Sequence, residues 1–395
     1  MQKQTRVLGV LGCIAIVGLL SFVSTQAKAA DKKDWTMLVY LNGNNNLDDF
    51  GAKNIEQMQQ VGSTNQLNVV VQWASLAASD TKRLLVQKDP TATTVTSPVV
   101  QTLPVVDMGD KQSLTDFIQW GVQTYPADHY FVVVWDHGAG WHLTTKMKMH
   151  SRDISFDERS GHHITTEELG TVIDGAAQLI GHKVDIYGSD ACLMAMVEVA
   201  QQMYGSVGTF VGSEEVEPGD GWPYDSFLKA WAANPSASAN DIGKMLVTAY
   251  HDYYTAQQNS STTFSAIDMD RLPDLLTSIT SLKEKLLAKT DLTAVKTAAA
   301  SSSRYTYNDY VDLSDLVDNV RTALDKSDEA QVALDNVSLQ IKSAIVASAT
   351  TGIKANGISI WWPSQASDFQ SYGDRYSALK FNRATGWADF LKRLF

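Results

Sequence analysis

Cysteine is nearly absent from this sequence, which has only Cys13 and Cys192 among its 395 residues. Cys13 lies in an N-terminal segment that we expect to be removed, so the mature chain keeps one thiol and has no internal disulfide. A lone cysteine of this kind is a free reactive thiol, a link to another chain or an inert buried side chain. The cysteine count alone does not decide between these three.

Basic charge is also scarce, because 32 lysines and arginines face 44 aspartates and glutamates, for a formal net charge of −12. Binding to nucleic acid needs a basic surface, so the composition argues against a nucleic-acid partner and favours basic ligands. With 44% hydrophobic and 19% charged residues, the chain has the composition of a globular protein with a substantial core.

Long apolar runs are confined to the N-terminus. Lys3 and Arg6 precede an uncharged apolar run over residues 7–23, and Ala27-Lys28-Ala29 provides a small-residue cleavage motif. This pattern predicts a Sec-type signal peptide over residues 1–29, with an uncleaved membrane anchor as the alternative. The mature protein is therefore expected to be secreted or otherwise extracytoplasmic, with no membrane contact after signal cleavage.

Short apolar runs alternate with segments of helical periodicity through the first two thirds of the chain. The runs are continuously apolar, as in parallel strands that are buried on both faces. This order predicts an α/β fold, with a central, mostly parallel sheet and helices on both faces. The expected strands cover residues 34–41, 66–73, 82–87, 130–135, 183–187 and 208–212, and the expected helices cover residues 47–61, 113–125, 165–173 and 193–204.

The last third of the chain has a different character, being polar and mostly of helical periodicity. We therefore expect two parts, a core over residues 34–268 and a mainly helical C-terminal part over residues 269–395. A final strand at residues 357–362 is expected to pack on the core.

Two of the expected strands end in residues that can carry chemistry. The strand at residues 130–135 runs into a histidine followed by glycines, and the strand at residues 183–187 runs toward the single mature cysteine. In open α/β sheets, ligands bind beyond the carboxyl ends of the strands. His137 and Cys192 are therefore expected to meet in one crevice. A hydrogen-bonded structural histidine and an inert cysteine are the alternatives.

This pair of residues is suited to nucleophilic catalysis. A thiolate is a good nucleophile, and a helix expected to begin at Cys192 would lower the pKa of its thiol. His137 can protonate a departing amine, and the backbone N–H groups of Gly138 and Cys192 can bind a developing oxyanion. Asp190 opposes this chemistry because its charge should raise the thiol pKa, and binding of a substrate cation would explain its presence.

A third segment, residues 212–224, follows the next expected strand and borders the same crevice. Its carboxylates, the glycine-flanked Asp220 and its aromatic side chains can form the wall of a pocket for a guanidinium or ammonium group. An acidic surface loop with a packed Trp222 is the alternative.

These segments resemble, in order, the motifs of the clostripain family of cysteine peptidases, which have a caspase-like fold. Residues 34–47 resemble the family's opening strand and Asn-rich turn, and residues 137–141 resemble its histidine motif. Residues 189–194 resemble its nucleophile motif, and residues 213–222 resemble its pocket segment. The resemblance extends from residue 34 to the Gly386-Trp387 ending.

The resemblance implies a cysteine endopeptidase that works through a thioester on Cys192, with His137 as the partner in a catalytic dyad. It places Asp190 at the base of the S1 pocket and Asp220 nearby. Family members with these carboxylates cut protein or peptide substrates after Arg, and less readily after Lys. We expect the protein to be a monomer.

The resemblance also implies self-cleavage between residues 141 and 163. The basic residues of this polar stretch are the candidate processing sites, namely Lys146, Lys148, Arg152 and Arg159. The alternative to an enzyme is a non-catalytic secreted binding protein on a peptidase scaffold.

Metal sites are only weakly indicated, and the sequence requires no cofactor. Neither His-Glu-x-x-His nor paired Cys-x-x-Cys occurs, so a zinc site among the histidines of residues 137–163 is a minor alternative. Some relatives use calcium, but no EF-hand spacing is present, and Asp312, Asp315 and Asp318 are expected on a solvated helix face. The clustered histidines are His137, His142, His150, His162 and His163.

Overall fold

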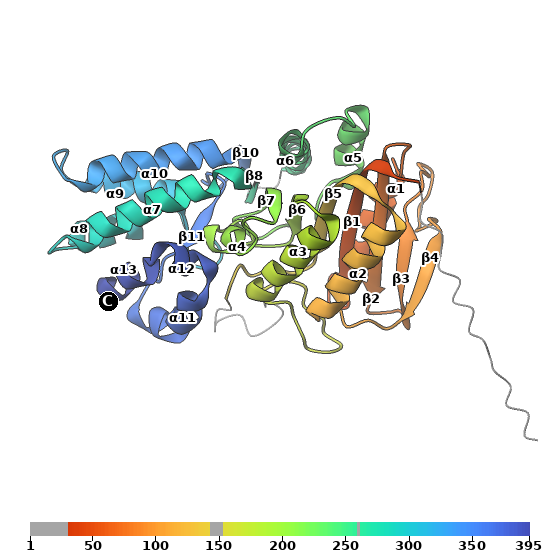
Figure 1. Ribbon diagram of the computed structural model, residues 1–395, viewed down its shortest axis with the longest axis horizontal. Coiled ribbons are helices and arrows are strands. Elements are labelled where there is room, and N and C mark those ends of the chain that lie inside the picture. The colour runs from red at the N-terminus through yellow and green to blue at the C-terminus, as the bar shows by residue number, and fades with distance from the viewer. Residues whose placement is uncertain (1–30, 143–152, 259–260) are drawn as a thin grey trace, which may run out of the picture.

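A nine-stranded mixed sheet forms the centre of the molecule, in the order β10-β8-β7-β6-β5-β1-β2-β3-β4 (Figure 1). The computed structural model describes residues 31–142, 153–258 and 261–395. The strands of this sheet are β1 (Lys33–Gly43), β2 (Leu67–Ser75), β3 (Asp80–Leu85), β4 (Val99–Pro104), β5 (Ala127–Trp135), β6 (Val184–Asp190), β7 (Val207–Gly212), β8 (Thr262–Asp268) and β10 (Ile345–Thr351).

The five central strands β2, β1, β5, β6 and β7 run parallel to one another. The outer strands β3, β4, β8 and β10 are antiparallel to their neighbours. The apolar side chains of β5 alternate between the two faces and are buried on both, for example Val132 on one face and Val133 on the other. This double burial is why the central strands read as continuous apolar runs.

Helices cover both faces of the sheet, which confirms the predicted α/β class. Core side chains of α2, α3 and α4 pack with Leu38 and Tyr40 of β1, whereas those of α1, α5 and α6 pack with Met37 and Val39 of the same strand. Figure 1 shows α2, α3 and α4 in front of the sheet. These helices are α1 (Asp48–Gln59), α2 (Lys111–Thr124), α3 (Thr166–Ile180), α4 (Val197–Gln202), α5 (Tyr224–Ala233) and α6 (Ala239–Ala256).

The C-terminal part adds helices beside one edge of the sheet, on the left in Figure 1. It also returns β10 to the main sheet next to β8, and a small second sheet pairs β9 (Tyr310–Asp312) with β11 (Ser359–Trp361). The division of the chain at residue 268 stays a prediction. The helices are α7 (Leu272–Leu287), α8 (Thr293–Ala300), α9 (Leu313–Ala323), α10 (Ala330–Ala344), α11 (Ala366–Ala378), α12 (Lys380–Thr385) and α13 (Trp387–Leu394), and a short 3₁₀ turn, η1, spans Met269–Arg271.

The helix expected over residues 193–204 begins later than predicted, because α4 covers only Val197–Gln202. Leu193 has a positive φ of 65°, and its N–H donates a hydrogen bond of 3.1 Å to the carbonyl of Glu215 in the loop after β7. This long-range bond holds the backbone away from the helical conformation. Cys192 therefore does not lie at a helix N-terminus, and the prediction that it does is wrong.

The acidic set expected on a solvated helix face is mostly buried, so that prediction is also wrong. Asp312 is fully buried, and its carboxylate caps α9 by accepting the Asp315 N–H at 2.6 Å. Asp315 is 4% exposed and accepts both the N–H and the hydroxyl of Ser303. Asp318 pairs with Arg321 on the surface. Capping of a helix start explains this burial better than cation binding.

A buried glutamate gives the fold a testable dependence on pH. Glu198 of α4 is fully buried and accepts hydrogen bonds from the Trp361 N–H (2.9 Å) and the Tyr376 hydroxyl (3.0 Å). Burial raises the pKa of its carboxyl to about 7. A raised pKa means that the folded state holds the proton more tightly than the unfolded state. This group's contribution to stability is therefore lost as the pH rises from about 4.5 through 7.

We expect Glu198→Gln to have the same melting temperature as the wild type at pH 5 and a higher one at pH 8. Glutamine keeps the acceptor oxygen without ionising, and the difference in unfolding free energy at pH 8 is up to about 3 kcal/mol. Thermal unfolding at the two pH values measures this. Equal melting temperatures of the variant and the wild type at pH 8 would show that ionisation of Glu198 does not destabilise the fold.

Candidate active site

The register of two parallel strands brings the predicted catalytic residues to one level. Strand β5 pairs with β6 so that Trp135 lies opposite Asp190 at the carboxyl ends of both strands. His137 and Cys192 each follow two residues later. Both side chains therefore leave the same edge of the sheet from neighbouring strands, in the position where ligands bind to this class of sheet.

Gly138 is the point of closest approach between the two loops. A Cβ atom at this position would lie 2.4 Å from the Cys192 carbonyl oxygen and 3.0 Å from the Ala191 Cβ, so only glycine fits without displacement. Within the part of the chain that the structure describes, neither the Gly138 N–H nor the Cys192 N–H donates to a backbone carbonyl. Two amide donors are thus left available beside the thiol.

The Cys192 thiol is half-buried and is a free cysteine. The Glu217 N–H donates to its Sγ at 3.3 Å. Burial raises the pKa of the thiol to about 12, and the charges of Glu217 and Glu215 act in the same direction. The predicted lowering of this pKa by a helix is wrong, because no helix begins here. The thiol is therefore protonated at neutral pH, and a cation bound beside these carboxylates would lower its pKa.

The Asn-rich turn after β1 holds the histidine loop. Asn42 and Asn45 donate from their Nδ2 atoms to the two oxygens of the buried Asp136, at 2.9 and 2.6 Å. Asn46 places its Oδ1 atom 2.7 Å from His137 Nε2. An amide oxygen accepts hydrogen bonds, so this contact favours the imidazole tautomer with hydrogen on Nε2. Sequence reasoning treated these asparagines only as turn residues and missed Asn46.

Two carboxylates lie buried beside the thiol. Asp190 is 4% exposed, and its Oδ2 accepts hydrogen bonds from the Tyr224 hydroxyl at 2.8 Å and the Trp222 N–H at 3.3 Å. Both carboxylate oxygens of Glu217 are buried, and the Ala191 N–H and the Trp222 side chain offset only part of the cost of ionising this group. Burial raises the pKa of Asp190 to about 7 and raises the pKa of Glu217 well above its ordinary value, to which the Asp190 charge adds.

Glu217 was not assigned a role from the sequence, although it lies within the expected pocket segment. Neither Glu217 nor Asp190 has a lysine, arginine or histidine within 4.0 Å among the residues that the structure describes. A buried pair of carboxyls without a cation is costly when both are ionised. The site is therefore suited to receive a cation from outside the chain.

Asp220 lies on a turn that covers the Asp190 carboxylate. A Cβ atom at the adjacent Gly221 would lie 3.1 Å from Asp190 Oδ1, and the Asp220 carbonyl accepts the Asn54 side-chain amide at 2.9 Å. The Asp220 side chain is half-exposed and has no ion-pair or hydrogen-bond partner among the described residues. The structure therefore brings Asp220 close to Asp190, as a second and more accessible carboxylate.

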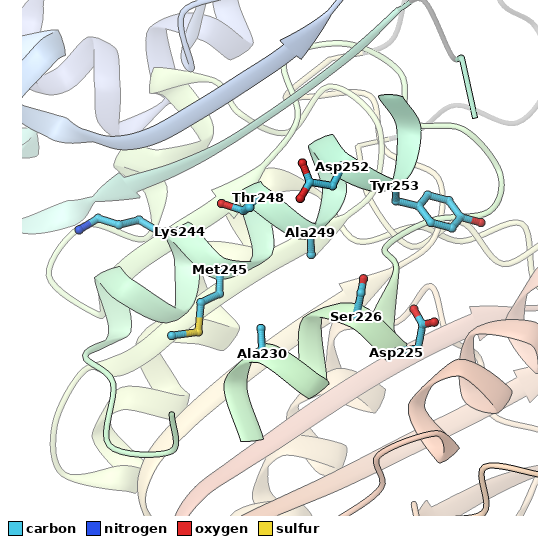
Figure 2. Close-up of a pocket in the computed structure, with 9 residues that line it drawn as sticks. All are labelled: Asp225, Ser226, Ala230, Lys244, Met245, Thr248, Ala249, Asp252 and Tyr253. Carbon is cyan, nitrogen blue, oxygen red and sulfur yellow. The ribbon is translucent and has the colours of Figure 1, made fainter. Parts of the chain in front are cut away.

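A groove of about 540 Å³ runs between α5 and α6 on the side of the sheet that Trp222 covers (Figure 2). Asp225, Asp252 and Tyr253 lie toward one end of it, and the charges of Asp220 and Asp225 both add to the effect of burial in raising the pKa of Tyr253. The groove thus begins close to the turn that carries Asp220. It is lined by Asp225, Ser226, Ala230, Lys244, Met245, Thr248, Ala249, Asp252 and Tyr253.

The C-terminal part holds both the pocket segment and the histidine loop. The buried Glu214 accepts hydrogen bonds from the Tyr305 hydroxyl at 2.9 Å and the Gly357 N–H at 2.6 Å. The Tyr310 hydroxyl donates to the Ala139 carbonyl at 2.6 Å. The loops that carry the candidate site are therefore fixed by residues far along the chain, and the C-terminal part belongs to the working unit.

The histidines of the candidate zinc site contact different partners. His142 is buried and lies 3.0 Å from Asp309, whereas the exposed His162 lies 2.5 Å from Asp107. His150 lies outside the described residues. Among the described residues, no group of three or more histidine, cysteine, aspartate or glutamate side chains is arranged to hold a metal ion.

The candidate processing residues fall into two groups. Arg159 is described, and its exposed side chain donates hydrogen bonds to the carbonyls of Ser75 (3.2 Å) and Ala78 (2.7 Å) between β2 and β3. Its guanidinium is thus engaged in holding the adjacent turn. The others lie outside the described residues, namely Lys146, Lys148 and Arg152.

The comparisons with known proteins agree with this geometry. The model of the clostripain family, Peptidase_C11, matches residues 39–393. The chain belongs to the clostripain family. This confirms the resemblance inferred from the histidine, cysteine and pocket motifs. It also confirms, at the level of the family, the assignment to the cysteine peptidases, which act on proteins or peptides.

Individual relatives share little sequence identity with this chain. Clostripain from Hathewaya histolytica is 28% identical over 143 residues, which are 34% of this chain and 27% of clostripain. The chain thus matches about a quarter of the length of this curated relative.

Solved structures share the fold of the clostripain-family chain over nearly its whole length. A secreted C11 cysteine protease from Bacteroides thetaiotaomicron, solved with an irreversible peptide inhibitor, has a TM-score of 0.69 at 21% identity. An inactive zymogen C11 protease from Parabacteroides distasonis has a TM-score of 0.68 at 19% identity. Each similarity covers 90% of this chain and 99% of the other. These likenesses confirm the predicted caspase-like fold.

The expected signal peptide lies outside the described residues, which begin at residue 31. Within the described ranges, none of the helices has both the length and the apolar character needed to span a bilayer.

Proposed function

We propose that this protein is an exported cysteine endopeptidase that cleaves protein and peptide substrates after Arg, and less readily after Lys. The observation that carries the proposal is the buried pair of carboxyls, Asp190 and Glu217, beside the lone thiol of Cys192. Family membership supports the peptidase chemistry. These two carboxyls have no cationic partner among the described residues, which supports a cationic P1 side chain.

The reaction would proceed by acyl transfer to the thiol. Cys192 Sγ forms a bond to the scissile carbonyl carbon, and the Gly138 and Cys192 N–H groups bind the oxyanion. The C–N bond then breaks, and His137 transfers the thiol proton to the leaving amine. Water hydrolyses the resulting thioester, which releases a peptide with a new carboxylate and restores the thiol.

Substrate binding would itself activate the thiol. In the free protein, burial and nearby negative charge keep the pKa of Cys192 high. A guanidinium bound to Asp190 and Glu217 neutralises that charge and lowers the cost of forming the thiolate. The planar fork of arginine fits two carboxylates better than the single ammonium of lysine, and Asp220 adds attraction at the entrance.

We propose that Asn46 is a positioning residue for His137. Replacing Asn46 by alanine should lower kcat about 10-fold or more and change KM little, because the imidazole loses its orienting partner. Asn46→Asp keeps the acceptor and should raise the pKa of His137, which shifts the acidic limb of the pH profile upward, because His137 must be neutral to take the thiol proton. Steady-state kinetics across pH measures both effects. Wild-type kcat in Asn46→Ala would contradict the role.

We propose self-processing after Lys146, Lys148 or Arg152, in preference to Arg159 with its engaged guanidinium. Purified wild-type protein should show a chain break on a denaturing gel, and Cys192→Ala should remain intact. Replacing the three preferred residues by glutamine should block the break, whereas Arg159→Gln, the matched control, should leave it. A break in Cys192→Ala would indicate another protease.

The direct test of the proposed function is a panel of fluorogenic peptides with Arg, Lys, Asp, Asn or Phe at P1. Arg should be cut best and Lys second, and Cys192→Ala should cut neither. Cleavage after Asp or Asn would remove the roles proposed for Asp190, Glu217 and Asp220. No cleavage by processed protein would favour a binding protein on a peptidase scaffold.

Two further parts of the proposal have their own tests. N-terminal sequencing of the secreted protein tests the proposed export through residues 1–29. Light scattering tests the proposed monomeric state.

A further inference from the structure

A second cavity lies on the other half of the sheet, where β3 and β4 meet α2. It has a volume of about 500 Å³, and Arg83 and Gln72 contribute side chains from the sheet. The loop that follows β4 contributes Val105, Val106 and Asp107, and α2 contributes Ser113 and Asp116. Neither His137 nor Cys192 lines this cavity, so it is distinct from the candidate active site.

The guanidinium of Arg83 is buried and firmly held. Arg83 is only 6% exposed. Its Nε donates to Gln72 Oε1 at 2.8 Å, and its Nη1 donates to Gln101 Oε1 at 3.0 Å. The group also lies over the Trp120 ring, 4.5 Å from its centroid. Two neutral acceptors and an aromatic ring therefore fix the guanidinium plane against the cavity.

Arg83 has no counter-ion within ion-pair distance in the part of the chain that the structure describes. Among residues 31–142, 153–258 and 261–395, no carboxylate lies within 4.0 Å of its nitrogens, and Nη2 has no hydrogen-bond partner. Burial lowers its pKa to about 10, with Asp116 opposing the shift from farther away. Buried charges are normally paired, because removing a charge from water is costly without compensation.

The other charges around the cavity are negative and stand apart from Arg83. Asp107 is engaged by His162 Nδ1 at 2.5 Å and by the Ser160 hydroxyl at 2.7 Å. Asp116 lies on the exposed side of α2 and accepts the Gln112 amide at 2.8 Å. The cavity thus offers one buried cationic donor, and carboxylates that would repel a ligand carrying several negative charges. A singly charged anion fits it better than a phosphate.

We propose that this cavity binds a carboxylate group, held by the Arg83 guanidinium and carried by a free amino acid or by the C-terminal residue of a peptide. The free Nη2 is the donor left for the ligand, and the Ser113 hydroxyl lines the same space. An ammonium group on the ligand would face Asp107 or Asp116. The binding is independent of the Cys192 chemistry.

The test is calorimetric titration of the full-length Cys192→Ala protein with glycine, N-acetylglycine and glycinamide. Glycine and N-acetylglycine carry the carboxylate and should bind with millimolar affinity, whereas glycinamide lacks it and should not bind. Tetraalanine and tetraalanine amide form a second pair. Binding of tetraalanine but not of tetraalanine amide would assign the site to peptide C-termini. Binding of glycine but not of tetraalanine would assign it to free amino acids. Failure of all carboxylates to bind would overturn the proposal.

Variants tie the binding to the buried guanidinium. Arg83→Lys keeps the charge but loses the fork, and should weaken N-acetylglycine binding at least about 10-fold. Lys82→Gln, which removes the neighbouring cation of β3, is the matched control and should bind as before. Asp116→Asn is a surface change that should strengthen N-acetylglycine binding, and it tests the proposal even if the Arg83 variant is unstable. Unchanged affinity in both Arg83→Lys and Asp116→Asn would refute the site.

Discussion

Cys192→Ala should lower kcat/KM for an Arg peptide at least about 10⁴-fold, to the level of the uncatalysed background. The reason is that Cys192 is the one cysteine outside the proposed signal peptide, so no other thiol of the fold can replace the nucleophile. Binding should survive, because the carboxyls of Asp190 and Glu217 remain in place. Rates with a fluorogenic Arg substrate measure the first effect, and calorimetric titration of Cys192→Ala with the same Arg peptide measures the second.

Cys192→Ser and Ser189→Ala serve as the control variants for this prediction. Serine retains the shape but ionises far less readily than a thiol, so it should be nearly as inactive as alanine. Ser189 is buried in β6 directly before Asp190. Among the described residues its hydroxyl bonds only to the Tyr187 hydroxyl, at 2.9 Å, so its loss should leave activity within a few-fold. Activity retained in Cys192→Ala would mean that the chemistry lies elsewhere.

Asp190→Asn and Glu217→Gln should each lower kcat/KM for Arg substrates about 10²-fold or more, with a smaller effect on substrates having a neutral P1 residue. Each change removes one partner of a buried, charge-assisted contact with the P1 guanidinium. Asp225→Asn is the matched control. It removes a carboxylate that lies outside the buried pair, and it should leave the preference for Arg intact. Specificity ratios between Arg peptides and citrulline peptides report the loss directly.

The same pair predicts the direction of the pH dependence. The pKa of Asp190 is raised to about 7 by burial, and only the ionised carboxyl attracts a guanidinium. The value of kcat/KM for Arg peptides should therefore rise as the pH increases through neutrality. Asp190→Asn should flatten this acidic limb. An unchanged limb in this variant would assign the titration to another group.

The candidate site was largely predictable because its geometry follows from strand order. Continuous apolar runs identify parallel strands, and parallel strands bring their carboxyl ends to one edge, so His137 and Cys192 could be placed together from the sequence. The glycine after His137 was equally informative, since the contact with the Cys192 carbonyl leaves no room for a side chain.

The residues that sequence reasoning missed depend on contacts between loops that are distant in the chain. Asn46 reaches His137 across 91 positions, and Glu217 reaches Cys192 across 25. The helix expected directly after Cys192 failed for the same reason, because the Leu193 amide bonds to the Glu215 carbonyl instead of to its own turn. Local periodicity carries no information about such contacts.

Both edge strands of the main sheet were missed because their composition is not typical of buried strands. Strand β4 is the open edge of the sheet and exposes much of its surface, and β10 is rich in alanine, serine and threonine at the opposite edge. An edge strand has one neighbour and less burial, so it lacks the continuous apolar run that marks β5.

The most direct test of the central claim compares two irreversible inhibitors that differ only at P1. One carries arginine, and the other carries citrulline, which has nearly the same shape without the charge. Intact-mass and peptide mapping should find a single adduct on Cys192, formed at least about 10²-fold faster with the arginine compound. Equal rates for the two compounds, or an adduct elsewhere than Cys192, would contradict the account of an acidic pocket serving this thiol.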